Sequence, residues 1–402
     1  MPVSTDEPSR SGKDLGQGAE DGLAVYIHWP FCAAKCPYCD FNSHVRDSVD
    51  QERWARALGR ELEHYAGQTT SSAVTSIFFG GGTPSLMDPE TVASVLERVS
   101  RLWNLAADAE ITLEANPTSV DVSCFGALEQ AGVNRLSLGV QALNDVDLSA
   151  LGRWHSVDDA RRALSAAQAD FPRVSFDLIY GRPGQAAGTW RQELSEALDL
   201  ASGHLSLYQL TIEPGTAFYN EQRAGRLALP GTEEGARLLE ETWDLCARRG
   251  YGAYEVSNFA TPGQECRHNL AYWRYGEYVG VGPGAHGRIT TDGAVRATTQ
   301  RRSPEGWLKD VETSGHGTEA QDVLSADACA TECLIMGLRT REGVSASRFQ
   351  QVAGVPLVQG LDQGALSEFV DRGLLEWDRE YLRATARGLM VLDTLLARLV
   401  RG

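Results

Sequence analysis

Six short runs rich in β-branched and aromatic residues alternate with longer amphipathic segments over the first half of the chain. The runs cover residues 24–29, 75–79, 109–115, 134–140, 173–180 and 204–210, and apolar residues recur at helical spacing over 51–66, 88–103 and 189–201. Strands that alternate with helices of this length form βα units, which build a parallel sheet with its helices outside. Six such units fit a three-quarter barrel better than a closed eightfold one, so the sequence predicts an α/β fold with a partial barrel.

The rest of the chain divides by composition. Residues 1–22 are rich in Ser, Gly, Asp and Glu and predict a disordered tail, with the barrel over 23–215 and a barrel-completing or linker region over 216–318. We expect that region to hold a helix near 232–249, a Tyr- and Gly-rich segment over 251–287 and a helical linker. Residues 319–402 predict a winged-helix-like α+β domain with helices at 324–338, 345–352, 363–373 and 386–400 and a two-stranded wing at LLEWD and YLRAT. Basic residues are too few there for DNA reading, so packing or partner docking is the better interpretation.

Charge and hydropathy narrow the classes of partner. The net charge of -17 would repel a phosphate backbone, which argues against nucleic acid as a partner. The N-terminus has no apolar signal segment, and no run of about 18 apolar residues predicts a transmembrane helix. We therefore expect a cytoplasmic protein, and peripheral membrane contact stays open.

Three of the eight cysteines, Cys32, Cys36 and Cys39, stand in C-x3-C-x2-C spacing directly after the first predicted strand. Three thiolates on one loop can bind three irons of a 4Fe-4S cubane and leave the fourth iron open to a small molecule. A zinc site normally has four ligands and would need a second cysteine pair elsewhere, which is missing from the sequence. The alternative of three buried structural cysteines that stand close together by chance is disfavoured, because Pro30 and Pro37 make the segment a loop. The spacing thus favours an iron–sulfur cluster.

Polar and glycine residues follow the other predicted strands, where α/β barrels gather their chemistry. Three glycines at 80–82 allow close backbone approach, Glu114 can accept from an ammonium group, and Arg153 offers a planar fork to a carboxylate. Gln141 and Asp177 suit ribose hydroxyls, and Tyr38, between two cysteines, suits an adenine ring. Singly, each residue has a structural alternative as a turn, a solvated cap or a partner of buried backbone. Their register at successive strand ends predicts one site for an amino-acid nucleoside.

The motifs YIHWPFCAAKCPYCDF, FFGGGTPS, LEANP, RLSLGVQ, LGRWH, DLIYGRPGQ and YQLTIEPGT together resemble the radical S-adenosylmethionine (SAM) superfamily, in the group of oxygen-independent coproporphyrinogen III oxidase and its HemW-type relatives. The resemblance covers residues 24 to about 395. It implies a partial (β/α)6 TIM-like barrel of the radical SAM type with a C-terminal winged-helix-like module, and reductive cleavage of SAM to a 5'-deoxyadenosyl radical. It also implies that Cys32, Cys36 and Cys39 bind the cluster and that SAM contacts Tyr26, Tyr38, Gly81, Gly82, Thr83, Glu114, Gln141, Arg153 and Asp177.

Two departures from the oxidases are informative. The oxidases carry a fourth cysteine where this chain has Phe41, and their N-terminal extension is replaced here by the polar tail. Both features resemble the HemW-type heme chaperones, which implies heme as cargo and a heme-accepting protein as partner. The alternative is a radical SAM oxidation enzyme such as coproporphyrinogen III oxidase. Radical chemistry would require an electron donor of the flavodoxin or ferredoxin type.

The HemW-type subgroup has a His-Asn-x-x-Tyr-Trp motif implicated in heme binding, and this chain has His268, Tyr272 and Trp273 in that pattern. An imidazole can ligate iron and the two aromatic faces can lie against a macrocycle. The structural alternative is a hydrogen-bonded histidine with two core aromatics. His286 on a Gly-rich turn and Cys266 are further candidates for heme contact. Cys329 and Cys333 lie one helical turn apart on an apolar helix, which predicts buried packing.

Overall fold

The computed structural model describes residues 22–69 and 73–400, so the predicted tail over 1–22 lies almost wholly outside the described residues. All six predicted strands are confirmed, and a seventh strand joins them in one parallel array in the order β11-β1-β4-β5-β6-β7-β8. These strands are β1 (Leu23–Trp29), β4 (Val74–Gly81), β5 (Leu105–Ala115), β6 (Arg135–Gln141), β7 (Arg173–Tyr180), β8 (His204–Gln209) and β11 (Tyr278–Val281).

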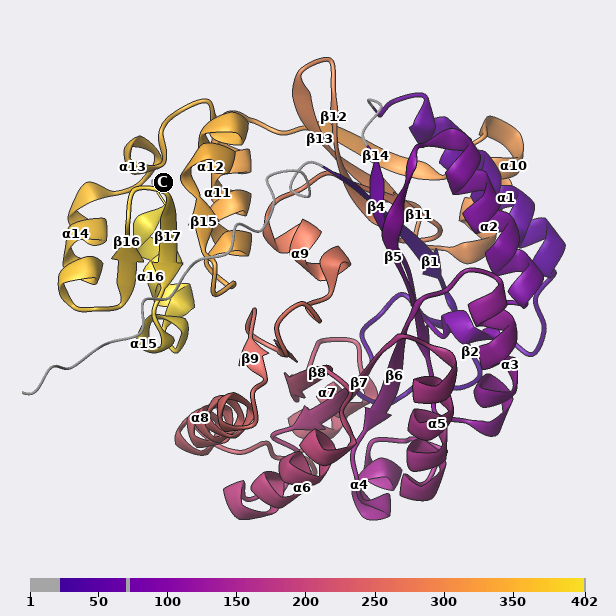
Figure 1. Ribbon diagram of the computed structural model, residues 1–402, viewed down its shortest axis with the longest axis horizontal. Helices are drawn as coiled ribbons and strands as arrows, with labels where there is room; N and C mark the ends of the chain where they lie inside the picture. Colours follow the sequence, from indigo (N-terminus) through magenta and orange to yellow (C-terminus); the bar gives the residue numbers. More distant parts are fainter. Residues whose placement is uncertain (1–21, 70–72, 401–402) are drawn as a thin grey trace, which may run out of the picture.

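Helices cover the convex face of this curved sheet (Figure 1). They are α1 (Gln51–Ala66), α2 (Pro89–Leu102), α3 (Ser119–Gln130), α4 (Asp145–Ala150), α5 (Val157–Asp170), α6 (Ala187–Leu200) and α8 (Thr232–Arg248), with α7 (Ala217–Arg223) after β8. The side chain of Asp50 caps α1, and Trp54, Leu58 and Leu62 lie buried along its inner face because they recur every four residues. The partial α/β barrel is thus confirmed.

The helix predicted near 232–249 is confirmed as α8, but the segment after residue 287 differs from the expected helical linker. Short strands extend the sheet at both edges, and they are antiparallel to their neighbours apart from the β11–β1 pair. They are β9 (Gly252–Ala253) and β10 (Asn258–Ala260) beyond β8, and β12 (His286–Thr291), β13 (Ala294–Gln300) and β14 (Thr318–Val323) beyond β11. Among the described residues, only α10 (Pro304–Ser314) gives helical structure to the expected linker, and α9 (Arg267–Trp273) carries the His-Asn-x-x-Tyr-Trp motif.

One buried carboxylate on α1 binds the segment that follows β11, the helix α10 and the segment that precedes β14. Glu61 accepts hydrogen bonds from the backbone N–H groups of Gly282 at 2.8 Å and Gly317 at 2.7 Å, and from the indole of Trp307 at 2.9 Å. Because Glu61 is fully buried, these donors replace the water that its carboxylate would otherwise need. The strands after β10 are therefore an integral part of the barrel.

The C-terminal domain has its own core, in which Cys329 and Cys333 are buried as predicted. It contains α11 (Ala326–Gly337), α12 (Ala346–Ala353), α13 (Leu357–Gly360), α14 (Gln363–Asp371) and a sheet of β15 (Val344–Ser345), β17 (Tyr381–Ala384) and β16 (Leu375–Trp377). The predicted wing corresponds to β16 and β17. The single helix predicted over 386–400 is wrong: the chain breaks between α15 (Ala386–Leu389) and α16 (Leu392–Leu399), where Val391 leaves the helical conformation.

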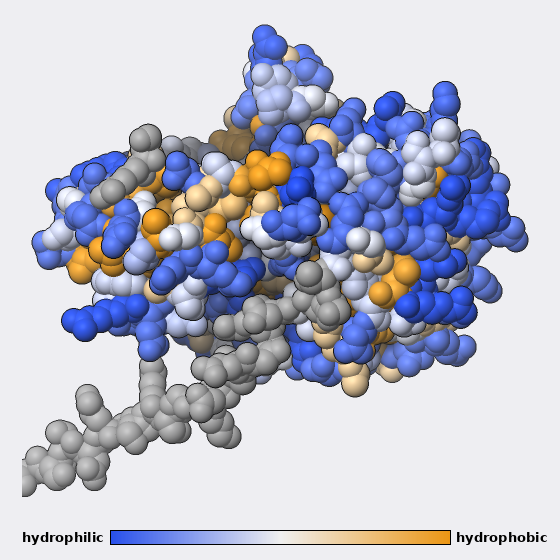
Figure 2. Space-filling view, turned by 90° about the horizontal axis from the view of Figure 1, so that it is seen from above, coloured by the Kyte–Doolittle hydropathy of each residue, from blue (hydrophilic) through white to orange (hydrophobic). Residues whose placement is uncertain are grey.

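The exterior is mainly polar, in keeping with the acidic composition. Figure 2 shows a largely hydrophilic face with hydrophobic side chains gathered mainly in its left half, over the C-terminal domain. None of the helices in the described ranges combines the length and apolar character that a membrane span requires.

Candidate functional site

The cysteine loop follows β1, and its two ends are joined by a short parallel pair, β2 (Phe31–Cys32) and β3 (His44–Val45). Cys32, Cys36 and Cys39 are half-buried free thiols. The hydroxyl of Thr83 donates to Cys32 Sγ at 3.5 Å, and Arg153 Nη1 donates to Cys36 Sγ at 3.4 Å. Burial raises the pKa of Cys32, whereas the Thr83 hydroxyl lowers it. Donors directed at sulfur suit thiolates that carry negative charge.

A pocket of about 150 Å³ brings the cysteines together with almost all of the residues predicted to contact SAM. Tyr26 is the exception, and it lines an adjoining larger cavity. The residues that line the pocket include Cys32, Cys36, Tyr38, Cys39, Gly81, Gly82, Thr83, Glu114, Gln141, Arg153 and Asp177.

Two carboxyl groups lie deep in this pocket. Burial, with the nearby Asp177 carboxylate, raises the pKa of Glu114 to about 8. Burial also raises the pKa of Asp177 to about 6, while hydrogen bonds from Ser206 and Ser137 oppose the shift. A cationic group entering the pocket would stabilise both charged forms.

Arg153 lies in the loop after α4 and joins several parts of the pocket. Its Nη2 donates to the backbone carbonyl of Gly139 at 2.9 Å and to the side chain of Asn116. Its buried Nε has no hydrogen-bond partner among the described residues. A buried guanidinium with an unused donor is prepared for an anionic ligand such as a carboxylate.

Backbone geometry leaves room for a ligand beside the cysteines. Gly81 has φ of +113°, and a Cβ atom there would lie 2.5 Å from the ring of His28. Only glycine fits this position, and because glycine has no side chain, the backbone at the end of β4 stays accessible to a ligand. Three thiols on one loop, a glycine cradle and an unpaired guanidinium donor therefore fit an iron–sulfur cluster with an amino-acid nucleoside.

A larger cavity of about 760 Å³ adjoins this pocket and shares Phe41, Gly81 and Glu114 with it. Its walls come from the barrel, α9 and, through Met336 and Arg339, the C-terminal domain. Many of the wall residues are aromatic or histidine: Tyr26, His28, Phe41, Tyr208, Tyr272, Trp273, Tyr278 and His286. A volume of this order holds a ligand of a few hundred daltons.

The residues of the His-Asn-x-x-Tyr-Trp motif occupy different places. Tyr272 and Trp273 line the large cavity, whereas His268 is 1% exposed and lines a smaller pocket of about 190 Å³ beside it. The His268 ring has Ser76 Oγ 3.0 Å from Nδ1 and the Tyr272 hydroxyl 2.7 Å from Nε2. Burial lowers the pKa of His268 to about 3, so the imidazole is neutral.

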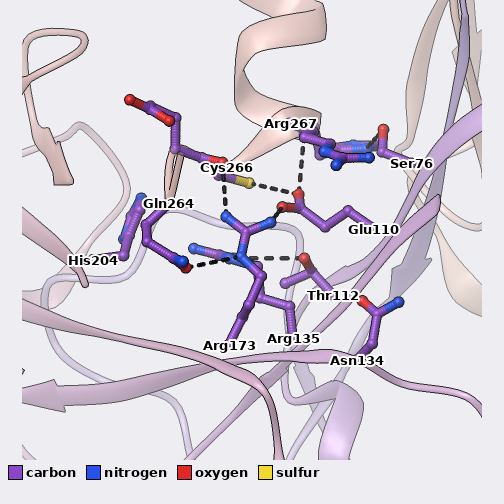
Figure 3. A network of polar contacts seen from close by, with 12 residues as sticks. Ser76, Glu110, Thr112, Asn134, Arg135, Arg173, His204, Gln264, Cys266 and Arg267 are labelled. Atoms are coloured by element: carbon purple, nitrogen blue, oxygen red, sulfur yellow. Dashed lines mark hydrogen bonds and ion pairs between the residues drawn. The ribbon is translucent and has the colours of Figure 1, made fainter. Parts of the chain in front are cut away.

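A buried network holds α9 in this orientation (Figure 3). Glu110 on β5 pairs with Arg173 and accepts from the backbone N–H of His268 at 3.2 Å and from Cys266 Sγ at 3.3 Å. Burial raises the pKa of Cys266 to about 12, so its thiol keeps its proton. Cys266 therefore belongs to this network and does not line the large cavity.

Asn116, at the end of the third predicted strand, has a role in the site that the sequence did not indicate, and Arg135 and Tyr208 were not predicted as site residues. Asn116 joins Arg153 to the Thr83 hydroxyl, to which it donates at 3.1 Å. Arg135 and Tyr208 occupy inward-facing positions of β6 and β8, and polar residues alternating along those strands were the available signal.

The comparisons with known proteins agree with this geometry. Residues 26–196 match the Radical SAM superfamily, and residues 324–391 match the HemN C-terminal domain. The solved structure of coproporphyrinogen III oxidase (HemN) from Escherichia coli superposes with a TM-score of 0.78 at 22% identity and covers 94% of this chain and 90% of that one. This likeness shows the fold. The fold and the three-cysteine loop together define a radical SAM protein, which implies a 4Fe-4S cluster and SAM as cofactors.

Full-length relatives narrow the assignment. "Radical S-adenosyl methionine domain-containing protein 1, mitochondrial" of Bos taurus is 43% identical over 94% of this chain and 87% of the relative. "Heme chaperone HemW" of Escherichia coli is 37% identical over 93% of this chain and 97% of the relative. This chain belongs to the HemW family of the radical SAM superfamily.

Proposed function

We propose that this protein is a heme chaperone, which binds heme and transfers it to an acceptor protein. The observation that carries the proposal is the aromatic cavity of about 760 Å³ beside the cysteine loop. The name of the Escherichia coli relative, at 37% identity over nearly the whole of both chains, supports the same function.

We assign the 4Fe-4S cluster to Cys32, Cys36 and Cys39. In this proposal SAM binds to Tyr26, Tyr38, Gly81, Gly82, Thr83, Glu114, Gln141, Arg153 and Asp177. When bound, the cluster and SAM supply one-electron reductive chemistry. Glu114 then accepts from the amino group, and the Arg153 fork holds the carboxylate. The buried carboxyl of Asp177 accepts from ribose hydroxyls.

The residues of the His-Asn-x-x-Tyr-Trp motif have different roles in this proposal. Tyr272 and Trp273 offer their rings to the macrocycle from the cavity wall. His268, with both ring nitrogens in hydrogen bonds, orients Tyr272 as long as these bonds persist. Direct ligation of iron by His268 would require one of these two hydrogen bonds to break and the freed nitrogen to reach the ligand.

The partners of the chaperone are a heme-accepting protein and, for any radical chemistry, an electron donor of the flavodoxin or ferredoxin type. Eight free cysteines suit a reducing compartment such as the cytoplasm. A coproporphyrinogen III oxidase has the same fold, but Phe41 stands at the position of the oxidases' fourth cysteine, so this alternative is less well supported.

The test uses anaerobically reconstituted full-length protein. We expect hemin titration to give a saturable Soret band and the loaded protein to pass its heme to an apo-hemoprotein. The same preparation, reduced and supplied with SAM, should leave coproporphyrinogen III unchanged. Formation of protoporphyrinogen, or failure to bind hemin, would overturn the chaperone assignment.

A further inference from the structure

The cysteine loop is clamped to one wall of the large cavity by Asn42. The Asn42 side-chain amide donates to the backbone carbonyls of Pro283 at 2.8 Å and Arg302 at 2.9 Å. Gly284 packs against it with φ of +78°, and a Cβ there would lie 2.7 Å from Asn42 Nδ2. This contact fixes the start of β12, where His286 lies, and Arg302 beside the loop that carries the cysteines.

His286 has a ring nitrogen available for a ligand. Its Nδ1 lies 3.3 Å from the hydroxyl of Thr299, which orients the ring, and its Nε2 makes no hydrogen bond within the described residues. His286 is exposed at the start of β12, with Nε2 accessible from the cavity, and its partial burial together with Arg288 and Arg302 lowers its pKa, which favours the neutral imidazole. His268 differs, because hydrogen bonds occupy both of its ring nitrogens and it does not line the large cavity.

Arg302 supplies positive charge at the same wall. Its guanidinium forms no ion pair with any described residue, whereas the neighbouring Arg301 pairs with Asp310 at 2.7 Å. An unpaired arginine at a cavity of a chain with net charge -17 is suited to a carboxylate of the ligand. Phe41, which is 61% exposed, adds an aromatic face to the cavity.

From these contacts we infer that the large cavity binds an iron tetrapyrrole, with His286 Nε2 as an axial donor to the iron and Arg302 paired with a peripheral carboxylate. This inference rests on the proposed function and adds the ligating residue and the carboxylate partner. The tetrapyrrole then lies against Phe41, next to the pocket assigned to the 4Fe-4S cluster and SAM.

The experiment titrates hemin and iron-free protoporphyrin IX into wild type, His286→Ala and Arg302→Ala. His286→Ala should shift the Soret maximum and weaken hemin binding about tenfold, because the iron loses its nitrogen donor, while protoporphyrin binding stays within about twofold of wild type. Arg302→Ala should weaken binding of both ligands about three- to tenfold, and added salt should reduce this difference.

Matched controls separate ligation from altered folding. His64→Ala removes a histidine that stacks on His316, away from the cavity, and Arg301→Ala removes the adjacent arginine; both should bind hemin as wild type does. Imidazole added to His286→Gly should restore the wild-type Soret band.

The outcomes distinguish the two claims. If wild type binds and transfers heme but His286→Ala keeps the wild-type spectrum, the axial assignment is wrong and the chaperone function stands. A changed spectrum in His268→Ala together with an unchanged one in His286→Ala would move the ligand to His268. If wild type binds no hemin, both claims fail.

Discussion

The backbone N–H of Gly81 donates a hydrogen bond to the carboxyl group of Glu114 across 3.2 Å. This contact joins the ends of β4 and β5 beside the cysteine loop. The hydrogen bond lowers the pKa of Glu114, but burial and the nearby Asp177 carboxylate outweigh it and raise this pKa to about 8. The proposed acceptor for the ammonium group of SAM therefore holds a proton at neutral pH until the ligand binds.

Affinity for SAM should depend on pH. Below about pH 8 the proton on Glu114 must leave before the carboxylate can accept from the ammonium group, so affinity should rise about tenfold between pH 6.5 and pH 8. Isothermal titration calorimetry on the reconstituted protein measures this. Glu114→Gln should bind more weakly and show no such rise; an equal rise in that variant would locate the titrating group elsewhere.

Each cysteine of the loop should be needed for the cluster, because each thiolate gives one iron its only protein bond. We expect Cys32→Ala, Cys36→Ala and Cys39→Ala to lose most iron and sulfide after anaerobic reconstitution. Cys124→Ala is the control, since Cys124 is a free cysteine on α3. A full complement of iron in any of the first three variants would refute the assignment.

Removal of the Arg153 guanidinium should weaken SAM binding by about 1.5 to 3 kcal/mol, the usual cost of losing a charge-assisted hydrogen bond. Calorimetry of Arg153→Ala, with iron content measured in parallel, tests this. Arg162→Ala on the exposed face of α5 should have no effect. Unchanged affinity in Arg153→Ala would show that the carboxylate binds elsewhere.

Glu110→Ala should destabilise the fold by about 3 to 5 kcal/mol, because Arg173 loses its buried partner and the start of α9 loses its acceptor. Urea denaturation followed by circular dichroism gives the change. Asp108→Ala is a close control, since Asp108 joins β5 to α9 through Arg267 in an exposed pair at 2.9 Å and should cost at most about 1 kcal/mol. Equal losses in the two variants would contradict this account.

Much of the barrel was predictable from sequence, because its strands are continuous apolar runs bounded by helices with one apolar face. The strand predicted over 173–180 and the helix predicted over 51–66 match β7 and α1 at both ends. The gathering of strand-end residues in one pocket followed from the same regularity, since parallel strands end at one edge of a barrel.

The parts that were missed depend on contacts between distant residues. β11 is four residues long and lies in a Gly-rich segment, so its pairing with β1 has no local signal. The inward rotation of His268 is set by Glu110 and Ser76, which are more than 150 positions away. Sequence could supply the motif but not the direction in which its histidine points.

The pairing of β1 with β11 has a consequence for synthesis on the ribosome. Tyr26 and Gly280 are register partners, so one edge of the strand that leads into the cysteine loop stays unpaired until roughly 250 more residues have been translated. At 5 to 20 residues per second this interval lasts on the order of 10 to 50 s. During that time the edge of β1 that later pairs with β11 is open to other strands, and the cysteine loop that follows β1 has already been synthesised.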